Sequence, residues 1–205
     1  MRLIYLGSEI PSNKTLLING GVTHLGVAFH GLKQRVHQEI PELLVNYPDE
    51  DAIRLHALPG LSPEKQEGLS EDELRDFAAE YEHFIETNCD RLASWLEFDS
   101  LLGPDWVRSR RNDFYDRFDA QCFRPIWHFE QGVRELESLS DNFPHVALPL
   151  RAVEQFTALP GLLRNYKNQY ETMFHLVSAT RPESLAALPV ETVYTATWQA
   201  PMRRG

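Results

Sequence analysis

Cysteine is scarce in this 205-residue sequence, which contains only Cys89 and Cys122. Neither residue lies in a CxxC or CxxH pattern. A disulfide framework or a structural zinc site needs several such residues at short spacing, so the sequence argues against both. We expect two buried thiols that stay reduced, which is typical of proteins in a reducing compartment.

Long apolar runs are also missing. No uncharged apolar stretch reaches the roughly 18 residues that a membrane-spanning helix needs. The N-terminal sequence MRLIYLGSEIPSN lacks the apolar core and cleavage site of a signal peptide and indicates a first strand. We therefore expect a cytoplasmic protein with no membrane partner.

Positive charge is in deficit: 20 Lys and Arg stand against 30 Asp and Glu, which gives a net charge of −10. Basic residues cluster only locally, in residues 108–111 and 203–204. A protein that holds a nucleic-acid backbone tightly usually has a basic face. The composition therefore disfavours nucleic acid as a tightly bound partner.

Several catalytic motifs are absent as well. The sequence has no Walker loop, GxGxxG, HExxH or GxSxG motif. These motifs would indicate phosphate binding, dinucleotide binding, a zinc protease or a serine hydrolase. No cofactor and no metal site are predicted.

Short apolar and β-branched runs do recur along the chain, and they predict seven strands. The runs are nearly continuous rather than alternating, which is typical of strands covered on both faces in a parallel sheet. The predicted strands are residues 2–7, 24–29, 93–98, 124–128, 145–148, 175–179 and 192–197.

Helical patterns separate these strands. Ser70 and Glu73 form a capping-box pattern, followed by an apolar stripe that predicts a helix over about 71–91. Alternation of strands and helices implies right-handed βαβ crossovers. We expect one α/β domain over 1–205, a TIM-barrel-like parallel (β/α) barrel that is complete or lacks its last βα unit; an open doubly wound sheet is the alternative.

Residues 31–70 are predicted to form an irregular insertion, because they contain Pro41, Pro48, Pro59 and Pro63. A long loop of this kind is usually functional or disordered. A lid or substrate-binding segment and a tolerated surface insertion are both consistent with the sequence.

Four short segments, in order, resemble the queuine/archaeosine tRNA-guanine transglycosylases. The segments are residues 7–12 (GSEIPS), 96–99 (LEFD), 125–128 (PIWH) and 175–205. They look closest to the phage-type relatives that insert 7-deazaguanine bases into DNA. The resemblance implies a barrel that binds guanine or a 7-deazaguanine base in tRNA or DNA and exchanges it through a covalent glycosyl intermediate on an aspartate.

The resemblance also implies roles for individual residues. Asp99 and His128, at strand ends, would read the edge of the base, with Glu9 and Trp198 as further base-binding candidates. The position of the nucleophilic aspartate is occupied by Tyr194.

Each of these residues also has a structural interpretation. Asp99 could cap the helix that begins near Pro104, His128 could be a hydrogen-bonded structural group, Glu9 could be an exposed loop acid, and Trp198 could pack in the core.

Three functions therefore stay open. The first is a guanine transglycosylase, and the second is a catalytically inactive nucleobase-binding or partner subunit that has lost the nucleophile. The third is an unrelated barrel enzyme that acts on a small molecule. A homodimer is also expected, because several aromatic residues could be exposed: Trp95, Trp106, Phe114 and Tyr115.

Overall fold

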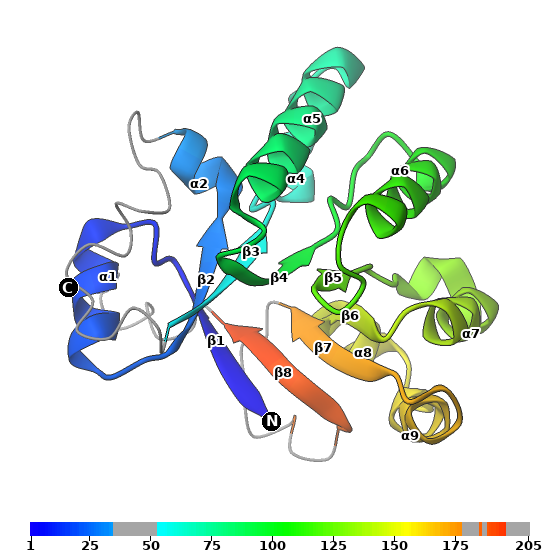
Figure 1. Cartoon of the computed structure of the whole chain (residues 1–205). Helices are drawn as coiled ribbons and strands as arrows, with labels where there is room; N and C mark the ends of the chain where they lie inside the picture. Colours follow the sequence, from blue (N-terminus) through cyan, green and yellow to red (C-terminus); the bar gives the residue numbers. More distant parts are fainter. Residues whose placement is uncertain (35–52, 178–184, 186–187, 196–205) are drawn as a thin grey trace. The chain divides into compact units, whose positions relative to one another are not determined.

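The fold is an α/β TIM-barrel-like fold, which confirms the predicted class. The structure is a computed structural model that describes residues 1–34, 53–177, 185 and 188–195. In this part of the chain, eight parallel strands alternate with helices (Figure 1). Contacts divide the chain into two compact units: unit 1 is Met1–Leu6 with Arg124–Gly205, and unit 2 is Gly7–Phe123.

Unit 2 contains three neighbouring parallel strands in the order β2-β3-β4, each followed by helical segments. Its longest helix begins at the predicted capping box, where the Ser70 hydroxyl accepts from the Glu73 amide and the Glu73 carboxylate accepts from the Ser70 amide. The elements are α1 (Pro11–Asn19), β2 (His24–Ala28), α2 (Phe29–Lys33), β3 (Arg54–Leu58), α4 (Pro63–Gln66), α5 (Glu71–Asn88), β4 (Leu92–Leu96) and α6 (Pro104–Arg117).

Unit 1 contains four neighbouring parallel strands in the order β1-β8-β7-β6. The short strand β5 (Phe123–Arg124) ends at the start of the unit's second segment, and Ile126 bridges to Ala147 of β6. Helices α7 and α9 lie side by side (Figure 1). The elements are β1 (Arg2–Leu6), the 3-10 helix η2 (Phe129–Gln131), α7 (Gly132–Asn142), β6 (His145–Pro149), α8 (Leu150–Gln155), α9 (Leu159–Tyr170), β7 (Met173–Val177) and β8 (Val190–Thr195).

The segment predicted to be irregular, residues 31–70, contains a strand that the sequence analysis missed. Strand β3 is buried from Leu55 to Leu58 and pairs with both β2 and β4. The polar residue His56 and the nearby prolines obscure the apolar pattern of this strand in the sequence. The described residues therefore contain eight strands rather than the seven predicted. Residues 35–52, the centre of the predicted insertion, lie outside the described residues.

The structure also bears on the cysteines and on membrane-spanning helices. Cys89 is exposed and Cys122 is half-buried, so the prediction of two buried thiols is wrong. Among the described residues, no helix is both long enough and apolar enough to cross a membrane.

The side chains of residues 124–128, which include the end of β5 and the segment after it, lie on two opposite faces of the sheet. Trp127 is buried, and its indole N–H donates to the carbonyl of Gly132 in α7 at 2.9 Å, which marks the face that carries the helices. Side chains alternate between faces along an extended segment. Arg124, Ile126 and His128 therefore lie on the opposite, inner face of the sheet.

Candidate functional site

A chain of hydrogen-bonded side chains crosses the inner face of unit 1 near the amino ends of its strands. His145 Nδ1 lies 2.9 Å from His175 Nε2, and His175 Nδ1 lies 2.6 Å from Thr192 Oγ1. All three residues are buried. Because both ring nitrogens of His175 are engaged within the protein, this chain stabilises the sheet rather than facing a ligand.

Unit 2 contains the same arrangement. His24 Nδ1 lies 3.0 Å from His56 Nε2, and His56 Nδ1 lies 2.8 Å from Ser94 Oγ. His24 and His145 are each the first residue of their strand, whereas each central histidine and each hydroxyl residue is the third residue of its own strand. Each unit thus has its own internal chain of two histidines and a hydroxyl residue.

Arg124 introduces a positive charge on the inner face of unit 1. Arg124 is only 6% exposed. Its guanidinium donates a hydrogen bond to the Tyr194 hydroxyl and lies over the Tyr194 ring, 5.7 Å from the ring centre. Its Nε is buried with no hydrogen-bond partner among the described residues. Within the same residues, no carboxylate forms an ion pair with Arg124.

The buried arginine of unit 2 differs in this respect. Arg111 is 3% exposed and forms two hydrogen bonds with the Glu97 carboxylate, at 2.8 and 3.0 Å. Burying a guanidinium is costly unless an acid and further hydrogen bonds compensate it. Arg111 has this compensation, whereas Arg124 has no such acid in the part of the chain that the structure describes, so Arg124 is the better candidate for a ligand-binding group.

A cavity of about 90 Å³ lies at the carboxyl ends of β5 and β6 in unit 1. The volume has room for several water molecules or a small organic molecule. His128, which follows β5, is held in place by its backbone N–H, which donates to the Gln131 side chain at 2.8 Å. The lining residues are His128, Phe129, Glu130, Pro149, Ala152 and Gln155.

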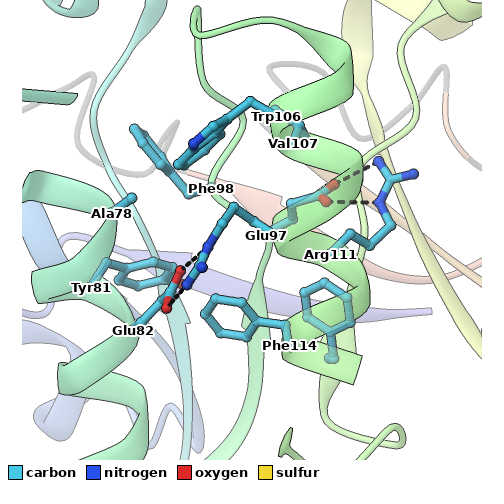
Figure 2. A pocket seen from close by; sticks show the side chains of 11 residues that line it. Ala78, Tyr81, Glu82, Glu97, Phe98, Trp106, Val107, Arg111 and Phe114 are labelled. Atoms are coloured by element: carbon cyan, nitrogen blue, oxygen red, sulfur yellow. Dashed lines mark hydrogen bonds and ion pairs between the residues drawn. The ribbon is translucent and has the colours of Figure 1, made fainter. Parts of the chain in front are cut away.

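A second hollow lies between α5, β4 and α6 in unit 2, but its volume is only about 10 Å³, room for about one water molecule. Figure 2 shows Glu97 facing Arg111 inside it. Glu82 binds Arg110, and this hydrogen bond is the main reason that the pKa of the Arg110 guanidinium is raised. The charges of this hollow are paired, so it is an ion-pair contact between α5 and α6 rather than a ligand site.

The residues predicted for the site lie in both units. Glu9 is buried in unit 2, and its carboxylate accepts from the Ala28 amide at 3.4 Å, so it is not an exposed loop acid. Asp99 is half-buried in the loop after β4, and the helix cap proposed for it belongs to Gly103 instead.

His128 and Tyr194 lie in unit 1, and Trp198 lies outside the described residues. The sequence analysis did not select Arg124. The available signal was a charged residue at the start of an otherwise apolar predicted strand.

Comparison with known proteins yields a likeness of fold. No family model matches the chain, and no curated protein matches it. Among solved structures, the chain is similar to the HpcH/HpaI aldolase from Desulfitobacterium hafniense DCB-2, with a TM-score of 0.51 and 7% sequence identity. The match covers 98% of this chain and 88% of the aldolase, and at this identity it shows a shared fold only.

These findings overturn the resemblance to the tRNA-guanine transglycosylases. No family model or curated relative supports that family, and the structural neighbour belongs to a different one. The assignments as a guanine transglycosylase, or as an inactive nucleobase-binding descendant of one, are therefore wrong. The physical reason is that three of the four matching segments are only four to six residues long, too short to distinguish one barrel family from another. The base and nucleic-acid partners remain untested predictions.

Proposed function

We propose that this protein is an enzyme that binds a small polar molecule in the cavity at the carboxyl ends of β5 and β6, with His128 transferring a proton. The observation that carries the proposal is the composition of the cavity wall. An imidazole, a carboxylate and an amide (His128, Glu130 and Gln155) line one small hollow, together with apolar side chains.

The chemistry of these groups suits proton transfer. Imidazole has an ordinary pKa of about 6.5, so it both accepts and donates protons near neutral pH. The Glu130 carboxylate and the Gln155 amide can orient a polar ligand through hydrogen bonds. Phe129, Pro149 and Ala152 supply apolar walls that limit the water around it.

The position of the cavity supports the same function. In TIM-barrel enzymes, the active site lies at the carboxyl ends of the strands. His128 lies four residues after the end of β5, and Pro149 is the last residue of β6. The small volume and the net charge of −10 favour a small molecule over a nucleic acid.

The test is a binding screen read at the histidine itself. Proton–carbon NMR of the histidine rings would follow the protein as hydroxy acids, keto acids, amino acids and sugars are added singly. We expect at least one compound to shift the His128 ring signals and to raise the Tm of the wild-type protein. The His128→Gln variant should lose that rise in Tm.

The matched control is His83→Gln, because the His83 side chain is 79% exposed on α5. This variant should keep the response of the wild-type protein. Compounds that shift no His128 signal, or that stabilise His128→Gln as much as the wild type, would refute the proposal.

A further inference from the structure

Arg124 uses few of its hydrogen-bond donors within the protein. A guanidinium carries five N–H donors, and in the described part of the chain only one side-chain hydrogen bond from Arg124 is formed, to the Tyr194 hydroxyl. The Nε is buried without a partner there. Such a group has N–H donors left for a negatively charged acceptor.

The strand registers of unit 1 place this charge near the cavity. Val193, Leu176 and Leu148 form one row across β8, β7 and β6. Tyr194 and Pro149 are each one residue further along their strands, and Pro149 lines the cavity. Arg124 is the last residue of β5, two residues before Ile126, which bridges to Ala147 of β6. Its side chain therefore extends towards the carboxyl ends of the strands, where it reaches Tyr194.

Arg124 and His128 also share one face of their segment. Each lies two residues from Ile126, whose backbone bridges to Ala147 of β6, so all three side chains point to the same face. Trp127 points the other way, towards α7. The imidazole and the guanidinium thus lie on the same side of the sheet.

We infer that Arg124 is an oxyanion-binding residue and that the molecule bound at His128 carries a carboxylate or phosphate group. The inference rests on the proposed function, because it names the class of that same ligand. The Nε edge of the guanidinium binds the anion, and Tyr194 is a positioning residue that fixes the orientation of the guanidinium. The planar fork of arginine matches the oxygen geometry of both anions.

The experiment uses two simple probes, sodium acetate and sodium phosphate, each compared with sodium chloride at equal ionic strength. Proton–nitrogen NMR of the arginine Nε–H groups gives the site-specific readout in the wild-type protein. We expect the Arg124 signal to shift with acetate, with phosphate or with both, and not with chloride. The two arms distinguish a carboxylate ligand from a phosphate ligand.

Variants test the role of the guanidinium. Arg124→Met should weaken acetate or phosphate binding by roughly 10- to 100-fold, the usual effect of losing a charged hydrogen bond. Arg124→Lys should restore part of this loss, because it keeps the charge without the fork. Arg134→Met, which removes an exposed arginine of α7, is the matched control and should bind like the wild type.

The outcomes separate the two proposals. An Arg124 signal that moves no more with acetate or phosphate than with chloride overturns the inference, even when uncharged compounds still shift His128. An Arg124 response to acetate or phosphate in a protein whose His128 signals never move supports the anion site and refutes the proposed function. If Arg124→Met fails to fold, the NMR signal of the wild-type Arg124 still decides between these results.

Discussion

His56 and His175 hold equivalent places in the two units of this protein. Each is the third residue of its strand, and each joins a histidine of the preceding strand to a hydroxyl of the following strand. In both places the register of the following strand shifts by one residue just before the central histidine. The same chain of two histidines and a hydroxyl residue therefore occurs in β2–β4 and again in β6–β8. Buried positions of this kind are more often occupied by apolar side chains.

This equivalence predicts matching losses of stability. Replacing either central histidine by leucine removes a hydrogen-bond partner from two buried or half-buried polar groups, at a cost of about 1–3 kcal/mol for each group. Urea unfolding of His56→Leu and His175→Leu should therefore show large and similar reductions in the free energy of unfolding. His83→Leu on the exposed face of α5 is the control. If the free energy of unfolding falls no more than in this control, the hydrogen bonds of His56 and His175 do not stabilise the sheet.

The ion pair between Glu97 and Arg111 gives a second prediction. Removing one partner of a buried pair leaves an uncompensated charge, so Arg111→Met should lower the free energy of unfolding by about 3–5 kcal/mol. The double variant Glu97→Leu with Arg111→Met should recover most of that loss. A double-mutant cycle from urea unfolding measures both effects, and a double variant that is less stable than Arg111→Met would contradict the prediction.

The capping box of α5 gives a prediction about pH. Hydrogen bonds from the Ser70 amide and then the Ser70 hydroxyl lower the pKa of Glu73 from its ordinary value of 4.5. The stabilisation from this carboxylate is therefore fully present above pH 4.5 and is lost as the pH falls through the lowered pKa.

The Glu73→Gln variant keeps a capping side chain that does not titrate. Thermal unfolding from pH 7 to pH 3 should show the wild-type protein losing Tm relative to Glu73→Gln only at the acidic end. A Tm difference that stays constant with pH would contradict the role of the carboxylate.

The homodimer remains a prediction, although part of its basis has changed. Trp95 and Phe114 are buried and belong to the core of unit 2. Exposed apolar side chains occur in both units, among them Leu16 and Leu101 of unit 2 and Phe129 and Val133 of unit 1. Light scattering during size-exclusion chromatography should give twice the 23.7 kDa mass of the chain, and a monomer mass would refute the prediction.

The sequence predicted the fold class well because continuous apolar runs mark buried parallel strands. It failed at β3, where His56 interrupts the apolar run and its hydrogen bonds to His24 and Ser94 help to make its burial favourable. Those partners are 32 and 38 residues away. No local pattern contains this information.

The candidate site was predictable only in part. His128 was selected as a residue at a strand end, and the structure places it at a cavity. Tyr194 was selected for its position in a motif, but its buried contact with Arg124 joins residues 70 positions apart. The absence of an acidic partner for Arg124 among the described residues is visible only in three dimensions.

The most direct test of the site is a crystal structure of the protein with the small anionic compound that binds it most tightly. We expect the compound in unit 1, with its carboxylate or phosphate oxygens at the Arg124 guanidinium and its remainder next to the His128 ring. A structure in which Arg124 is paired with a carboxylate of the protein itself, with the compound bound elsewhere, would contradict this function.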